Sequence, residues 1–251
     1  MNEDKFTGLG ELYAQFRPSY PEELIAYLFS FVGIGEEDVI ADIGSGTGIF
    51  TKQMLEKGNT VYGVEPNADM RKIAEAALTD FKNFISVSAT AENTTLPDHS
   101  IDVITVAQAF HWFDRAVFQE ECRRILKPQG WVVLIWNSRD SQSRLIQEND
   151  RINRQFCPNF KGFSGGMRGG TGTDDFIDFF CGAYQTKVFS HPLRLSEQGF
   201  IGRNLSSSYA LRKTDSQYSA YVAALQDLFE KYRDGDSIVM PNLTRMYIGR
   251  V

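Results

Sequence analysis

A glycine-rich turn between a predicted strand and a predicted helix is the feature that most constrains the fold. The residues are Asp42-Ile-Gly-Ser-Gly-Thr-Gly48. They follow an apolar run at 39–43 that predicts a buried strand, and they precede a helical pattern at 50–57. Glycine allows the backbone to turn tightly and to approach a ligand closely. In α/β sheets such a turn lies at the carboxyl edge of the strands, where nucleosides bind.

Strand and helix patterns alternate along the chain after this turn. Further strands are predicted at 60–64, 84–87, 101–106, 131–136, 184–195 and 237–249. Further helices are predicted at 69–78, 116–126 and 216–233. The alternation is typical of an α/β fold with a mostly parallel sheet. We therefore expect a Rossmann-like, seven-stranded sheet with helices on both faces and an antiparallel last strand.

The expected organisation is one domain over residues 1–251. Residues 1–35 are predicted to form an N-terminal helical cap, and 140–182 a lid-like insertion. Within that insertion six glycines fall in eleven residues, at positions 162, 165, 166, 169, 170 and 172. Because ordering glycine costs much backbone entropy, we predict that residues 157–175 form a mobile lid.

The composition limits the cellular compartments and the binding partners that we expect for this chain. The net charge is −6, whereas proteins that bind nucleic acid usually present a basic face, so a nucleic-acid partner is not expected. The three cysteines lie far apart and form no metal-ligand pattern, so no metal site is indicated. The polar N-terminus has no secretory pattern, and the apolar runs are too short to span a membrane. We expect a cytoplasmic monomer or homodimer without a membrane partner.

The spacing of the glycines discriminates between cofactors. A dinucleotide-binding loop reads G-x-G-x-x-G. Here the glycines are at 44, 46 and 48 and Ile49 follows, so the third glycine is one residue early. The carboxylate of Asp42 suits a cationic ligand better than a pyrophosphate. S-adenosylmethionine carries an ammonium and a sulfonium and no phosphate, so the loop favours it over a nicotinamide dinucleotide.

Several motifs together resemble those of class I S-adenosylmethionine-dependent methyltransferases. They are the loop at 42–48, Val64-Glu65-Pro66 and Leu126-Lys127-Pro128-Gln-Gly130. Two more stretches, Tyr13-Ala-Gln-Phe-Arg-Pro-Ser-Tyr-Pro21 and Ala107-Gln-Ala-Phe-His-Trp-Phe113, resemble the small-molecule branch with trans-aconitate-type enzymes. The resemblance covers about residues 10–139. It weakens beyond residue 140, where the methyl acceptor would be selected.

The resemblance implies a role for each residue of the loop. The backbone at Gly44 and Gly46 would hold the methionine part of the cofactor, and Asp42 would assist its ammonium through a water. Ser45 and Gly48 complete the cofactor-binding set in this loop.

The ends of later strands would hold the rest of the cofactor. Glu65, flanked by Pro66, would bind the ribose hydroxyls, as a carboxylate does at this place in dinucleotide folds. Ala91 and Glu92 would border the adenine, although Glu92 is also interpretable as an ordinary solvated carboxylate. Gln108 would lie beneath the sulfonium.

The N-terminal segment and an aromatic cluster supply the remaining candidates. Tyr13 would cover the bound cofactor, or pack as a half-buried tyrosine. Arg17 would pair with the methionine carboxylate or with an acidic acceptor, or remain a surface arginine. His111 is either a general base or a packed histidine among aromatic side chains. Arg17 and His111 are therefore the candidate catalytic residues.

The activity expected from these features is methyl transfer from S-adenosylmethionine to a small-molecule acceptor, with O-methylation of a carboxylate as one form of it. Four arginines either grip such an acid or are merely solvated: Arg139, Arg144, Arg168 and Arg212. The alternatives are an NAD-dependent oxidoreductase and a non-catalytic binding domain that has kept the fold.

Overall fold

The computed structural model describes residues 17–163 and 174–251, and within them a seven-stranded sheet forms the centre. Its strands are β1 Val39–Ile43, β2 Thr60–Val64, β3 Phe84–Val87, β4 Ile101–Ala107, β5 Leu126–Arg139, β6 Tyr184–Ser190 and β9 Asn242–Gly249. They lie in the order β3-β2-β1-β4-β5-β9-β6. The first five are parallel, whereas β9 is antiparallel to both β5 and β6. The predicted Rossmann-like sheet with an antiparallel last strand is confirmed.

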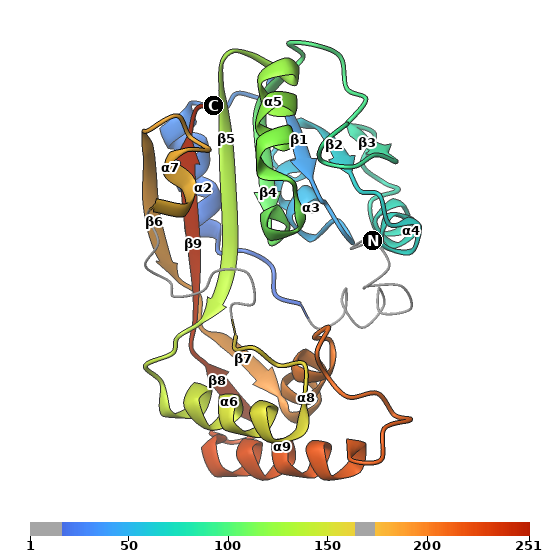
Figure 1. Cartoon of the computed structure of the whole chain (residues 1–251), viewed down its shortest axis with the longest axis vertical. Coiled ribbons are helices and arrows are strands. Elements are labelled where there is room, and N and C mark those ends of the chain that lie inside the picture. Colours follow the sequence, from blue (N-terminus) through green and yellow to red (C-terminus); the bar gives the residue numbers. More distant parts are fainter. Residues whose placement is uncertain (1–16, 164–173) are drawn as a thin grey trace.

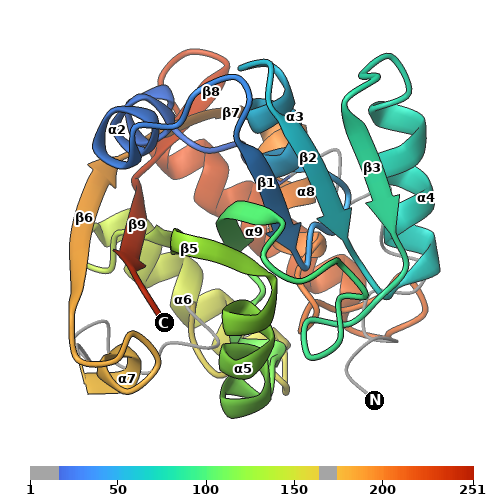
Figure 2. The same cartoon turned by 90° about the horizontal axis from the view of Figure 1, so that it is seen from above.

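Helices cover both faces of the sheet, as predicted (Figure 2). They are α2 Glu22–Val32, α3 Ile49–Leu55, α4 Ala68–Ala77 and α5 Arg115–Ile125. Successive side chains of β5 point to opposite faces, as the pleat requires. Val132 and Leu134 join the apolar cluster that contains α5, and Val133 and Ile135 join the cluster that contains α2, α3 and α4. Such burial on both faces explains why the central strand is continuously apolar.

A second, smaller body lies at the carboxyl end of β5 (Figure 1). It contains α6 Arg144–Phe156, β7 Leu193–Ser196, α8 Glu197–Leu205, α9 Tyr218–Tyr232 and β8 Ser237–Met240. We call these elements the cap. They enclose an apolar cluster separate from those of the sheet, to which Phe200, Tyr221 and Leu225 contribute.

The cap differs from the insertion expected at 140–182. Two stretches build it, one after β5 and one between β6 and β9. The residues that end the expected insertion belong instead to the sheet: after α7 Asp174–Ile177, Phe179 and Phe180 are buried in the cluster that contains α5. The predicted strands 184–195 and 237–249 are each divided between sheet and cap. Pro192 and Pro241 stand at the two divisions, since proline cannot donate to a strand ladder.

Some sequence-based predictions fall outside the described residues. Tyr13, the rest of 1–16 and the glycines from Gly165 to Gly172 are among them. The mobility predicted for 157–175 therefore stays a prediction. In its described part, Cys157 and Phe160 are buried in the apolar cluster of the cap. None of the helices in the described ranges is long and apolar enough to cross a bilayer.

Gly48 is expected to be costly to replace because a side chain there would contact α4 and the residue that follows it. It stands before α3 with φ of +80°, and a Cβ there would lie 2.9 Å from Leu78 Cδ1 and 3.2 Å from Ala74 Cβ. Gly48→Ala should therefore lower the free energy of unfolding by roughly 2–4 kcal/mol, through left-handed strain and overpacking. Denaturant unfolding without ligand measures this loss.

Gly33→Ala is the matched control. Gly33 also has a left-handed backbone, with φ of +77°, but a Cβ there would meet no described atom within 4 Å. Its loss should be only about 1–2 kcal/mol, from strain alone. Equal losses in the two variants would contradict the packing role of Gly48 against α4.

Candidate functional site

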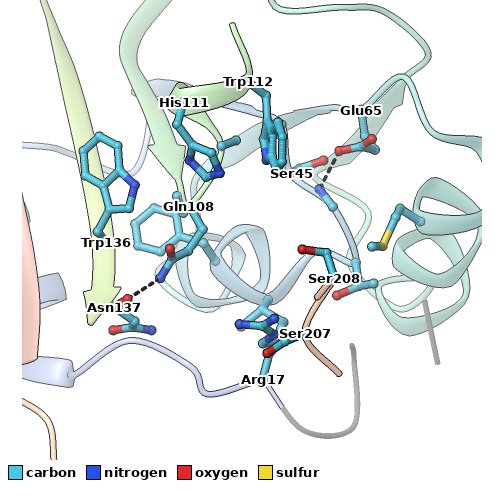
Figure 3. A pocket seen from close by; sticks show the side chains of 18 of the residues that line it. Arg17, Ser45, Glu65, Gln108, His111, Trp112, Trp136, Asn137, Ser207 and Ser208 are labelled. Carbon is cyan, nitrogen blue, oxygen red and sulfur yellow. Dashed lines mark hydrogen bonds between the residues drawn. The ribbon is translucent and has the colours of Figure 1, made fainter. Parts of the chain in front are cut away.

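A cavity of about 730 Å³ opens at the carboxyl edge of the sheet and extends to the cap (Figure 3). Its walls come from the glycine turn after β1, the segments after β2, β3 and β4, the end of β5, and the cap segment 207–209. Small-molecule and cofactor sites are usually about 300–1,000 Å³ in size. The position is the one that the sequence predicts for the cofactor.

The three glycines of the turn differ in what a side chain at each position would contact. A Cβ at Gly44 would lie 2.5 Å from Ala109 Cβ, so this glycine lets the turn pack against the segment after β4. Gly48 packs on α4 and does not line the cavity. At Gly46 a Cβ would meet no described atom within 4 Å, although this residue lines the cavity with φ of +56°. No described protein atom therefore excludes a side chain at position 46. The space beside this residue is part of the cavity, where a ligand would lie.

Glu65 is held against the glycine turn. One carboxylate oxygen accepts the Gly46 N–H at 3.0 Å (Figure 3), and the other accepts the Asn67 N–H at 2.8 Å. The side chain is 9% exposed and lines the cavity. A carboxylate has about four lone-pair sites, so two N–H bonds fix its orientation and still allow hydroxyl groups to bind. The residues present therefore fit a ribose at this wall.

Asp42 lies behind the turn and is absent from the cavity wall. It is 1% exposed, and its two oxygens accept the hydroxyls of Thr51 at 2.6 Å and Thr105 at 3.0 Å. Burial raises the pKa of Asp42 to about 6, against the hydroxyl bonds that lower it, and the charge of Glu65 adds to the rise. Asp42 therefore ties β1 to α3 and β4. Its predicted contact with an ammonium through water stays a prediction.

The candidate adenine residues lie together after β3. Ala91 and Glu92 line the cavity, and so does Pro66, which follows β2 beside Glu65. The Glu92 carboxylate accepts the backbone N–H of Asp114 at 2.9 Å, at the residue that caps α5. The adenine contacts themselves stay predictions.

Gln108 follows β4 in a left-handed backbone conformation, with φ of +63°. Its side-chain amide donates to the Asn137 carbonyl at 3.0 Å and so joins the ends of β4 and β5 (Figure 3). A residue other than glycine in this conformation costs roughly 1–2 kcal/mol, and such strain concentrates at functional sites. The structure places Gln108 at the centre of the cavity wall, between the cofactor turn and β5.

The aromatic cluster forms the short 3-10 helix η2 Phe110–Trp112. Phe110 is buried in the core and anchors the helix, so that His111 and Trp112 reach the cavity. Their ring centroids are 4.5 Å apart. The predicted aromatic wall is therefore present, and a base role for His111 stays a prediction.

The structure separates the arginines that the sequence groups together. Arg17 lines the cavity and donates to the Ser206 carbonyl at 3.3 Å, which connects the N-terminal segment to the cap. Arg139 also lines the cavity. Arg144 and Arg212 are exposed and do not, which favours the alternative that they are solvated. Arg168 lies outside the described residues.

Sequence reasoning missed most of the cavity wall formed by β5, β9 and the cap. The missed residues share only their position near the cap, and they are Trp136, Asn137, Arg203, Ser207, Tyr209 and Arg245. No motif marks them. The one signal in the sequence was that the apolar strand at 131–136 ends in Trp136 and passes directly into polar residues.

A known protein family matches the part of the chain that forms the glycine turn and its surroundings. Residues 41–134 match the methyltransferase domain family. The match begins in β1, includes the glycine turn and Glu65, and ends within β5. This part of the chain is therefore similar to methyltransferase domains.

Two uncharacterized methyltransferases illustrate the similarity. One from Mycobacterium tuberculosis is 37% identical over 140 residues, 56% of this chain and 55% of the relative. One from Schizosaccharomyces pombe is 29% identical over 141 residues, 56% of this chain and 55% of the relative. The chain thus spans about half the length of the curated relatives it matches.

Solved structures share the whole fold. A structure described as a type II methyltransferase from Anaeromyxobacter dehalogenans aligns with a TM-score of 0.63 at 20% identity, over 94% of this chain and 98% of that one. The YcgJ protein from Bacillus subtilis aligns with a TM-score of 0.57 at 17% identity, over 92% and 100%. This is the fold of Rossmann-like methyltransferases.

The buried Asp42 predicts a pH dependence of stability. The folded state keeps its proton up to about pH 6, whereas an unfolded chain releases it near pH 4. Between these values the folded state binds more protons, so this contribution to stability is complete below about pH 4 and lost as pH rises through 6. Asp42→Asn removes this loss.

The free energy of unfolding of Asp42→Asn, relative to the original protein, should therefore rise by up to about 3 kcal/mol between pH 4 and pH 7. Denaturant unfolding at a series of pH values measures this difference and cancels the other titrating groups. A constant difference for Asp42→Asn across the range would show that Asp42 ionises normally.

Proposed function

We propose that this protein is an S-adenosylmethionine-dependent methyltransferase that methylates a small molecule, at a carboxyl oxygen. The observation that carries the proposal is the Glu65 carboxylate, fixed by the Gly46 and Asn67 N–H groups at the wall of a cavity beside the glycine turn. The family match of residues 41–134 supports the methyltransferase assignment. The trans-aconitate-type resemblance supports the small acid.

The residues on the β1–β3 side would hold the cofactor. When bound, S-adenosylmethionine supplies a methyl group already activated on a positively charged sulfur. The backbone of Gly44 and Gly46 borders the methionine part, and Glu65 accepts the ribose hydroxyls. Ala91 and Glu92 border the base. The work of the protein is then to align the acceptor with the methyl carbon and to exclude water, and orientation alone can lower a barrier by about 7–11 kcal/mol.

If the methyl acceptor is a carboxylate, the residues around it do not have to remove a proton from it. An ionised carboxyl oxygen is already a nucleophile, so its methylation requires no general base. His111 lies at the cavity wall beside Trp112, and it would take a proton from a hydroxyl or amine acceptor instead. The cavity volume of about 730 Å³ favours a small acceptor beside the cofactor.

The alternatives are not favoured. A nicotinamide dinucleotide would use a similar sheet and a carboxylate like Glu65, but it requires the glycine spacing that this turn lacks. A non-catalytic domain would need neither the oriented Glu65 nor a cavity that reaches from the turn to the cap.

Titration calorimetry tests the assignment directly. We expect S-adenosylmethionine and its demethylated product S-adenosylhomocysteine to bind with dissociation constants in the micromolar range, and NAD not to bind. The reason is the spacing of Gly44, Gly46 and Gly48 together with the oriented Glu65. Binding of NAD without binding of S-adenosylmethionine would overturn the proposal.

Glu65→Gln should weaken S-adenosylhomocysteine binding by roughly 1–3 kcal/mol, the scale of hydrogen bonds to a charged group. The amide can offer only one acceptor oxygen, and its NH₂ would face a backbone N–H of Gly46 or Asn67. Calorimetry gives the change in affinity, and thermal unfolding shows that the fold persists. Glu120→Gln is the matched control, because Glu120 is exposed on α5 and pairs with Arg123. An unchanged affinity in Glu65→Gln would remove Glu65 from the site.

A further inference from the structure

Charged side chains divide the cavity into two sides. Glu65 and Glu92 follow β2 and β3, whereas Arg139 ends β5 and Arg245 lies in β9. In the sheet, β1 and β4 separate β2 from β5, which is about 14 Å at the usual strand spacing. Arg203, from the cap helix α8, also lines the cavity. The cofactor side is therefore acidic, and the side formed by β5, β9 and the cap is basic.

Arg139 lies on this basic side of the cavity wall. Its guanidinium carbon lies 4.0 Å from the centre of the Phe163 ring. Burial lowers the pKa of this guanidinium, and Arg17 beside it adds to the effect, while Tyr209 opposes it. No carboxylate of residues 17–163 or 174–251 forms an ion pair with it. A guanidinium nevertheless stays protonated in proteins.

Two neighbouring arginines add further positive charge to this side of the cavity. Arg203 is 5% exposed and donates to the amide oxygen of Asn242 at 3.1 Å, and Arg245 donates to the hydroxyl of Ser138. Both acceptors are neutral. A partly desolvated cation among other cations is costly unless an anion joins it. The planar guanidinium matches a carboxylate with two parallel hydrogen bonds.

The pairing of β5 with β9 fixes the position of Arg139. It is the last residue of β5 and pairs with Asn242 of β9 in the antiparallel ladder. The ring of Phe163, from the segment after α6, lies under its guanidinium. Arg139 thus belongs to the rigid sheet and faces the cavity at its border with the cap, which is the side away from Glu65.

We propose that Arg139 binds an anionic carboxylate group of the methyl acceptor and thereby selects acids over neutral molecules. This inference rests on the proposed methyltransferase function and extends it to a specificity-determining residue. Bound there, the acid compensates the guanidinium charge, and the rest of the acceptor extends toward the cofactor side.

Calorimetry of the protein saturated with S-adenosylhomocysteine tests the inference without turnover. The probes are glutarate, adipate and phenylacetate, each compared with its fully methylated, neutral ester. At least one acid should bind at least tenfold more tightly than its ester. Arg139→Gln should weaken that acid at least tenfold, and Arg139→Lys should restore part of the loss. Neither variant should change the affinity for S-adenosylhomocysteine, which also shows that the variants are folded.

Arg212→Gln is the matched control, since Arg212 is exposed and away from the cavity wall. It should bind the acid as the original protein does. The inference is overturned if no acid binds better than its ester, or if Arg139→Gln binds the acid normally. Absence of S-adenosylhomocysteine binding in the original protein would instead refute the proposed function. The acids would then be titrated against the protein alone, and the same comparison would decide the role of Arg139.

Discussion

The antiparallel pairing of β5 with β9 is the interaction on which the site depends. The ladder is unbroken from Val132 opposite Gly249 to Arg139 opposite Asn242. Its first part lies in the apolar core, where Val133 and Ile135 are covered by helices. Its last part reaches the cap, and there the same strand turns Trp136 and Arg139 toward the cavity. One continuous ladder therefore holds the cap and aligns the acceptor side with the sheet.

The opposite side of the cavity depends on contacts between short segments. The glycine turn is held by backbone bonds, since the N–H groups of Gly44 and Ser45 both donate to the Val64 carbonyl. Glu65 adds a bond from its side chain to Gly46. Asp42 fastens the turn from behind through two threonine hydroxyls. The turn is thus shaped before any ligand binds, which reduces the ordering cost of binding.

The sheet and the edge at which a ligand would bind could be predicted from the sequence, because both follow from patterns in short, continuous segments. Apolar runs bounded by glycine and proline predict the strands, and the turn at 42–48 predicts the edge that binds a ligand. The cap could not be predicted in this way. Its strands and helices come from two distant stretches that meet only in three dimensions, and Arg203 and Tyr209 reach the cavity through that packing.

Asp42 shows a second limit of sequence reasoning. The motif places a carboxylate beside the ligand loop, but it does not specify the direction of the side chain. In the structure the strand pleat turns Asp42 toward Thr51 and Thr105 and away from the cavity. Gly48 is similar, since its contact with α4 depends on where a second helix packs. Such outcomes are set by tertiary contacts.

The separate apolar core of the cap has a consequence for how this molecule diverges from its relatives. The family match ends at residue 134, shortly before the strand residues that face the acceptor side. Substitutions inside the cap disturb the packing of Phe200, Tyr221 and their neighbours, and they leave the clusters beneath the glycine turn intact. Relatives can therefore differ in the side chains that pack the cap while those beneath the glycine turn stay the same.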